Sequence, residues 1–151
     1  MKTDTTTTTQ LPIAVYGTLR VGYGNHRCIA GRTAEITPGV VDGYQLVVEG
    51  LPYARPSTTG RLVVEVMWPL PHIYDDVLAD LDRLEGYRPE AESNHYTRTQ
   101  VTVTTTDGDE IEAWLYEAGE WAQKRLRSYP TVVASGDYTD VHPAAGRRVP
   151  A

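Results

Sequence analysis

The sequence predicts an α+β fold, or a barrel-like β-sheet, built from many strands and one main amphipathic helix. Three observations predict it: strand-like runs are frequent, one segment has helical periodicity, and strands do not alternate regularly with helices. The chain has 151 residues, which suits one domain with a single hydrophobic core. We therefore expect a disordered, threonine-rich tail over residues 1–10 and a single domain over residues 11–151.

The first half of the domain is expected to contain three strands. An apolar run over residues 11–16 is typical of a buried strand, and the glycine-containing segment 17–24 that follows it is expected to be a loop. Valine-rich or apolar runs predict further strands over residues 45–49 and 60–68. The intervening segment 50–60 contains Pro, Ser and Thr, which predicts an irregular connection.

The main helix is predicted over residues 69–85, where the period of the apolar residues changes. Apolar side chains recur there every three or four positions, at Ile73, Val77, Leu81 and Leu84. Pro71 suits the first helical turn, and Gly86 is well placed just past the helix end.

The second half of the domain is predicted to contain a β-hairpin. Residues 96–106 alternate in polarity, and residues 111–117 form a second strand-like run. The turn Asp107-Gly108-Asp109 between them is a common hairpin turn sequence. One short extra helix is expected around residues 121–127.

Composition excludes several classes of function. The formal net charge of -6 argues against a nucleic-acid binder, which needs clustered Lys and Arg to neutralise phosphates. Cys28 is the single cysteine, so no intrachain disulfide can form. No run of 18 apolar residues predicts a membrane span, and the polar N-terminus does not resemble a secretory signal. We therefore expect a cytoplasmic protein that acts on neither nucleic acid nor membrane.

Glu85 is the strongest catalytic candidate from physical arguments alone. Tyr74, Leu78, Leu81 and Glu85 are spaced by four, three and four residues, so Glu85 continues the apolar stripe of the helix. It also sits at the helix C-terminus, where the macrodipole disfavours negative charge by roughly 0.3–1 kcal/mol. Partial burial and the dipole should raise its pKa, which suits a proton shuttle near neutral pH. The alternative is a glutamate that turns out to solvent at a fraying helix end.

The segment Tyr16-Gly17-Thr18-Leu19-Arg20 is the second candidate. A buried strand that runs into glycine can turn sharply and expose successive backbone N–H groups, which can bind an anionic carboxylate. Because a strand followed by glycine is common, a purely structural turn is the alternative.

Other reactive side chains carry no expected role. Cys28 and His26 are separated by one residue without an orienting partner, and a buried structural cysteine is the simpler interpretation. The four histidines show no metal-ligand spacing, so we expect neither a metal nor another cofactor. The aspartates of the predicted helix, at positions 75, 76, 80 and 82, are interpreted as a solvated face.

Several short motifs, taken in order, resemble the γ-glutamylcyclotransferase-like family, which includes the γ-glutamylamine cyclotransferases. The motifs cover most of residues 13–117 and are Tyr16-Gly-Thr-Leu-Arg20, Gly22, Asn25-His-Arg27, Gly60-Arg-Leu-Val-Val-Glu-Val66, Leu81-Asp-Arg-Leu-Glu-Gly-Tyr87, Tyr96-Thr-Arg98 and Ala113-Trp-Leu-Tyr116. Gly136-Asp137-Tyr138 resembles the C-terminal ending of the family.

The resemblance implies a small, mixed, barrel-like sheet with a few helices and a single cavity. It implies an enzyme of the transferase or lyase type, without a cofactor, that releases 5-oxoproline and a free amine from a γ-glutamyl amide. The family's catalytic glutamate corresponds to Glu85, and its substrate-binding loop corresponds to Tyr16, Gly17, Thr18 and Leu19. Its pocket tyrosines correspond to Tyr96 and Tyr116, with Tyr87 as a competitor for the place of Tyr96.

Two alternatives to catabolic cyclotransfer remain open at the level of sequence. One is a non-catalytic module that binds a small ligand or a partner on the same fold. The other is a biosynthetic enzyme that removes a γ-glutamyl protecting group. No motif in the sequence identifies the leaving amine or the oligomeric state.

Overall fold

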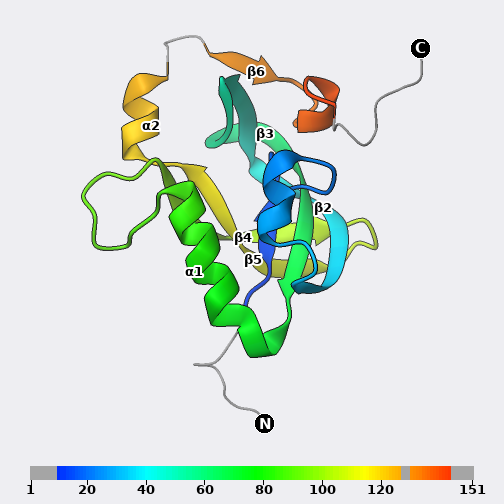
Figure 1. Ribbon diagram of the computed structural model, residues 1–151. Helices are drawn as coiled ribbons and strands as arrows, with labels where there is room; N and C mark the ends of the chain where they lie inside the picture. Colours follow the sequence, from blue (N-terminus) through cyan, green and yellow to red (C-terminus); the bar gives the residue numbers. More distant parts are fainter. Residues whose placement is uncertain (1–9, 127–129, 144–151) are drawn as a thin grey trace, which may run out of the picture.

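The computed structural model describes residues 10–126 and 130–143 (Figure 1). The strands are β1 (Ile13–Val15), β2 (Thr33–Glu49), β3 (Leu51–Pro69), β4 (Tyr96–Thr105), β5 (Glu110–Ala118) and β6 (Thr131–Val133). The α-helices are α1 (Tyr74–Glu85) and α2 (Glu120–Arg125), and 3₁₀ helices span Gly24–Cys28, Pro71–Ile73 and Tyr138–Asp140. Neither α-helix of this part of the chain is long and apolar enough to cross a membrane. Residues 1–9 of the predicted disordered tail lie outside the described residues.

Five strands close into a barrel, which confirms the predicted α+β, barrel-like class. The hydrogen-bonded order is β3-β1-β5-β4-β2, and β2 pairs with β3 to complete the ring. The sheet is mixed because β1 runs parallel to β5, while the remaining pairs in the described ranges are antiparallel. β6 adds to β2 outside the ring.

The strand β1 separates two hydrophobic clusters. Its Ala14 packs with the side chains inside the barrel, which include those of Leu62, Val64, Val66, Val103 and Leu115. The side chains of Ile13 and Val15 point the other way, because neighbours in a strand face opposite sides. They pack with Met67 and with Val77 and Leu81 of α1 in the second cluster. The helix α1 therefore covers the outer wall of the barrel at β1 (Figure 1).

The segment 50–60, predicted as an irregular connection, is part of a long β-hairpin. Residues 51–56 of β3 pair with residues 44–49 of β2, and Gly50 makes the turn with φ +79°. The prolines at 52 and 56 suggested a loop, because proline cannot donate to a strand ladder. They are tolerated because β3 pairs with β1 only at residues 65–67, so this end of β3 is an edge.

The helix prediction was correct at its C-terminus and wrong at its start. α1 ends at Glu85, and Gly86 takes the left-handed conformation with φ +69° that was expected just past the helix. The start lies later than predicted because Pro69 completes β3 and residues 71–73 form a 3₁₀ turn. The hairpin of β4 and β5 and the short helix α2 agree with the predictions.

Gly60 lies where the two long strands β2 and β3 approach each other closely. A Cβ on Gly60 would lie 2.7 Å from the backbone nitrogen of Gln45, so no side-chain motion can relieve the clash. We expect Gly60→Ala to lower the free energy of unfolding by about 1–3 kcal/mol, measured by urea denaturation.

Gly24→Ala is the matched control, because a Cβ at Gly24 meets nothing within 4 Å. Equal stability of the two variants would contradict the described packing.

Candidate active site

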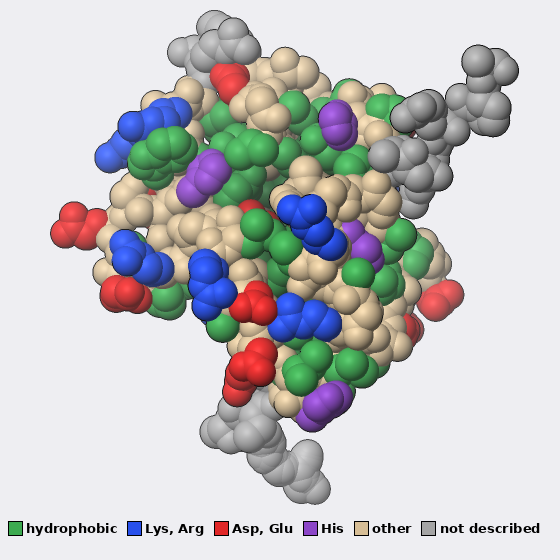
Figure 2. Space-filling model, in the orientation of Figure 1, with side chains coloured by type: hydrophobic (Ala, Val, Ile, Leu, Met, Phe, Trp, Pro, Cys, Tyr) green, Lys and Arg blue, Asp and Glu red, His purple; other side chains and the backbone are tan. Residues whose placement is uncertain are grey.

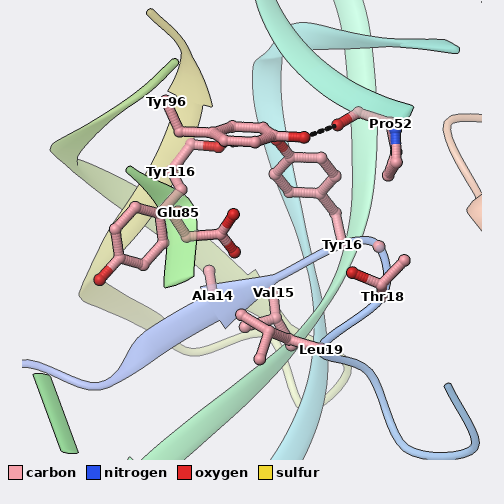
Figure 3. A pocket seen from close by; sticks show the side chains of 10 residues that line it. Ala14, Val15, Tyr16, Thr18, Leu19, Pro52, Glu85, Tyr96 and Tyr116 are labelled. Carbon is pink, nitrogen blue, oxygen red and sulfur yellow. Dashed lines mark hydrogen bonds between the residues drawn. The ribbon is translucent and has the colours of Figure 1, made fainter. Parts of the chain in front are cut away.

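A cavity opens where the C-terminal end of α1 meets the ends of three strands (Figure 3). β1 and β5 run parallel and both end there, while β4 begins there. The cavity encloses about 330 Å³ of space between atoms, part of it open to solvent. Its walls are formed by Ala14, Val15, Tyr16, Gly17, Thr18, Leu19, Pro52, Glu85, Tyr96 and Tyr116.

The loop after β1 presents free backbone donors to this cavity. The N–H groups of Gly17, Thr18 and Leu19 donate a hydrogen bond to no other described residue. The loop is nevertheless fixed: the Arg20 N–H donates to the Gly17 carbonyl at 3.0 Å, and the Asn25 N–H donates to the Thr18 carbonyl at 3.1 Å. Such successive free N–H groups form a site for an anion.

Gly17 is needed for the close approach of this loop to the β2–β3 hairpin. A Cβ on Gly17 would lie 2.6 Å from Cγ of Pro52, which also lines the cavity. The close packing of the loop against the hairpin thus explains why position 17 is a glycine: a larger residue would clash with Pro52.

A buried ion-pair network holds the loop from behind. The guanidinium of Arg20 contacts Glu65 of β3 at 3.3 Å and Asp137 at 3.0 Å. The second carboxylate oxygen of Glu65 accepts the N–H of Val21 at 2.9 Å. Because Arg20 is only 6% exposed, both acidic partners are needed to compensate its charge.

Two tyrosines form neutral, fixed walls. The hydroxyl of Tyr16 donates to the Tyr116 carbonyl at 2.6 Å and accepts the Ala54 N–H at 3.0 Å. The hydroxyl of Tyr96 donates to the Pro52 carbonyl at 2.8 Å. Burial, and the nearby Glu85 carboxylate, raise the pKa of both phenols well above the usual value. They therefore stay protonated and serve as hydrogen-bonded walls.

A second network fixes Tyr116, and it corrects the assignment of Asp82 to a solvated face. The hydroxyl of Tyr116 donates to Asp82 at 2.7 Å, and Arg98 of β4 donates to both oxygens of the same carboxylate at 2.9 and 3.2 Å. The side chains of Arg98 and Asp82 are 14% and 19% exposed. Asp82 thereby binds the last turn of α1, which carries Glu85, to the barrel wall.

The carboxylate of Glu85 points into the cavity, among Tyr16, Tyr96 and Tyr116 (Figure 3). It makes no hydrogen bond or ion pair with any other residue in the described ranges, although the side chain is half-buried. Burial raises the pKa of Glu85 from 4.5 to about 7. Glu85 can therefore take up and release a proton near neutral pH.

The structure places all seven predicted site residues around one cavity: Glu85, Tyr16, Gly17, Thr18, Leu19, Tyr96 and Tyr116. Between the two competing tyrosines, Tyr96 lines the cavity and Tyr87 does not. The ring of Tyr87 instead lies beside the guanidinium of Arg98, at 5.4 Å.

Sequence reasoning missed three wall residues, Ala14, Val15 and Pro52, and the supporting pair Asp82–Arg98. The position of Asp82, one helical turn before Glu85, was a usable indication of a shared face. No comparable indication existed for Pro52, because the sequence predicted an irregular connection over residues 50–60. Within residues 10–126 and 130–143, no three His, Cys, Asp or Glu side chains gather as metal ligands would.

Comparison with known proteins agrees with this geometry. The model of the family "Gamma-glutamyl cyclotransferase, AIG2-like" matches residues 13–140, which include every residue of the cavity wall. The chain belongs to this family. Membership indicates an enzyme of the γ-glutamyl cyclotransferase kind.

One named relative and two solved structures are similar to this chain. A protein of Methanocaldococcus jannaschii named "Putative gamma-glutamylcyclotransferase MJ1514" is 32% identical over 130 residues, 85% of this chain and 95% of the relative. The crystal structure of an uncharacterized Pyrococcus horikoshii protein, PH0828, is 27% identical with a TM-score of 0.59, over 87% of this chain and 92% of the other. YkqA of Bacillus subtilis shares the fold, with a TM-score of 0.64 and 21% identity, over 91% of this chain and 43% of the other.

The pKa of Glu85 predicts a pH-dependent loss of stability. A carboxyl with a pKa of about 7 when folded, against 4.5 ordinarily, keeps its proton in the native state between these pH values. Stability therefore falls as the pH rises from 4.5 to about 7, by about 3 kcal/mol in total. We expect Glu85→Gln to remove most of this fall, so that the variant is more stable than the wild type at pH 8.

Urea denaturation at pH 4.5 and pH 8 measures this difference. The control is Glu110→Gln, at an exposed glutamate of β5 that lines no part of the cavity. A variant Glu85→Gln with the wild-type pH dependence would show that Glu85 is not desolvated.

Proposed function

We propose that this protein is a γ-glutamyl cyclotransferase that converts a γ-glutamyl amide into 5-oxoproline and a free amine, with Glu85 as general acid and base. One observation carries the proposal: a desolvated carboxylate without a partner among the described residues faces the same cavity as the free N–H groups of residues 17–19. A polar site of this kind, a proton carrier beside an anion cradle, suits a substrate with an α-ammonium and an α-carboxylate.

Binding of the γ-glutamyl group would use both features. The free N–H groups of Gly17, Thr18 and Leu19 hold the α-carboxylate, as successive backbone donors hold other anions. The α-ammonium then lies against the carboxylate of Glu85, which gains a positive partner only when substrate is present. Tyr16 and Tyr96 exclude water, since their hydroxyls are occupied by backbone partners.

The chemical step follows from this placement. Glu85 takes one proton from the α-ammonium, and the α-nitrogen attacks the γ-carbonyl carbon to form the new C–N bond of the five-membered lactam. The bond from the γ-carbon to the leaving nitrogen then breaks while Glu85 returns a proton to that nitrogen. The second proton lost by the α-nitrogen balances the protonation of the released amine in water.

Intramolecular attack explains why the site needs no covalent nucleophile. The α-amine and the γ-carbonyl belong to one molecule, and well-oriented reactions of this type reach effective molarities of about 10⁵–10⁸ M. The rigid loop and the fixed tyrosines supply this orientation. Proton transfer through Glu85 contributes a further factor of about 10²–10⁴.

The decisive experiment compares release of 5-oxoproline from a panel of γ-glutamyl amides by wild type, Glu85→Gln and Glu110→Gln. We expect Glu85→Gln to lose at least about 100-fold in kcat, because the amide side chain keeps the shape and cannot carry the proton. Glu110→Gln should retain wild-type activity.

Three other results of this panel would each contradict part of the proposal. Equal activity of Glu85→Gln and wild type would remove Glu85 as the base. A folded wild type that binds glutamate-like ligands and releases no 5-oxoproline would favour a binding module on this fold. Activity limited to one modified biosynthetic intermediate would favour removal of a γ-glutamyl protecting group. Cytoplasmic location is part of the proposal and is tested by cell fractionation.

The pH dependence of kcat/KM provides an independent test. This parameter reports groups of the free enzyme, and the base must be ionised to accept a proton. We expect kcat/KM to rise with pH and to level off above about 7, the pKa to which burial raises Glu85. A profile that is flat between about pH 5.5 and 8 would contradict an essential base of this pKa.

A further inference from the structure

A chain of aromatic rings leads from the cavity wall to the protein surface. The ring of Tyr96, which lines the cavity, stacks on Tyr53 with centroids 5.0 Å apart and an interplanar angle of 21°. His95 lies 4.7 Å from the Tyr96 ring and 5.1 Å from the ring of Trp121, edge to face. Two consecutive ring contacts, from Tyr96 to His95 and from His95 to Trp121, thus connect the cavity wall to α2.

These rings are held in place by backbone and side-chain hydrogen bonds. The Tyr53 hydroxyl and Nε2 of His95 are 2.6 Å apart. The Gly119 N–H donates to the His95 carbonyl at 2.9 Å, and the Trp121 N–H donates to the Asn94 carbonyl at 3.0 Å. The segment before β4 and the start of α2 therefore form one rigid unit, so the aromatic surface exists before any ligand binds.

Trp121 is exposed although it is a large aromatic residue. Its exposed fraction is 42%, and the guanidinium of Arg125 lies 4.0 Å from its ring centroid. Figure 2 shows hydrophobic side chains gathered over α2 and the adjoining β2–β3 hairpin, beside a histidine. Trp121 is thus an exposed aromatic side chain that ring contacts connect to a wall of the cavity.

The proposed reaction places the leaving amine on this side. The α-carboxylate end of a γ-glutamyl amide lies at residues 17–19, and Figure 3 shows Tyr96 across the Glu85 carboxylate from Val15 and Leu19. A substrate extended from the loop past Glu85 therefore directs its amine portion toward Tyr96 and the rings beyond it.

We infer that His95 and Trp121 form a subsite for the leaving group, and that this subsite selects amines with a flat, uncharged aromatic or apolar substituent. The inference rests on the proposed cyclotransferase function. Flat apolar groups gain from contact with aromatic edges and faces. The guanidinium of Arg125 already makes a cation–π contact with the Trp121 ring. Its positive charge repels a second cation, so a leaving amine that carries an ammonium group gains no binding energy at this subsite.

Three synthetic substrates test this selectivity: γ-glutamyl methylamide, γ-glutamyl benzylamide and γ-glutamyl 4-aminobutylamide. We expect wild type to prefer the benzylamide over each of the other two by about tenfold in kcat/KM. Trp121→Ala should lower the benzylamide-to-methylamide ratio by about the same factor, mainly through KM, and Trp121→Phe should restore most of it. Val132→Ala, at an exposed valine on β6 outside the cavity, should keep the wild-type ratio.

Binding to the Glu85→Gln protein separates this inference from the proposed reaction. Calorimetry with the benzylamide and the methylamide should give dissociation constants that differ by about tenfold, and Trp121→Ala in the Glu85→Gln background should remove the difference. This result without any turnover by wild type would support the subsite and overturn the cyclotransferase proposal.

Two results would overturn the subsite while the reaction stands. One is release of 5-oxoproline from all three substrates at equal kcat/KM. The other is a preference for the 4-aminobutylamide over the benzylamide, which would indicate recognition of a cation.

Discussion

The complete burial of the short strand β1 is the constraint on which the rest of the structure depends. Its three residues complete the barrel between β3 and β5, and each of its two faces belongs to a different hydrophobic cluster. Because the strand ends at the rim of the barrel, the loop that follows lies directly against the last turn of α1. The packing of Val15 and Leu81 in the same cluster thus brings the free N–H groups of residues 17–19 and Glu85 to one cavity.

The site combines polar groups that the fold supplies with partners and polar groups that it leaves without them. The charges of Arg20, Asp82 and Arg98 are neutralised by ion pairs, and the phenols of Tyr16, Tyr96 and Tyr116 are hydrogen-bonded. Against this background the Glu85 carboxylate and the N–H groups of residues 17–19 are left without protein partners among the described residues. Unsatisfied groups beside fully satisfied networks are expected where a substrate completes the structure.

Local patterns predicted those parts of the fold that local forces determine. The helical period and Gly86 located the end of α1, and polarity alternation with Asp107-Gly108 located the hairpin of β4 and β5. The edge of β3 at Pro52 escaped prediction because its tolerance for proline depends on a missing neighbour strand, which is a tertiary property.

The residues of the candidate site were likewise predictable only where local patterns or short motifs identify them. Glu85 violated two local rules at once, and motif resemblance supplied the loop and the tyrosines. Asp82 was misassigned because its partners, Arg98 and Tyr116, lie on strands far along the chain.

The pairing of Arg20 with Asp137 has a consequence for the order in which the molecule assembles. These residues are 117 positions apart. In the same region, the Gly136 carbonyl accepts a hydrogen bond from the Val63 N–H of β3 at 2.9 Å. Contacts of such sequence separation cost more loop-closure entropy than local ones, and during synthesis they cannot form until the intervening chain has emerged. During synthesis, the loop of residues 17–19 therefore emerges before the strands β2 to β5, and the support from Asp137 follows only after these strands have emerged.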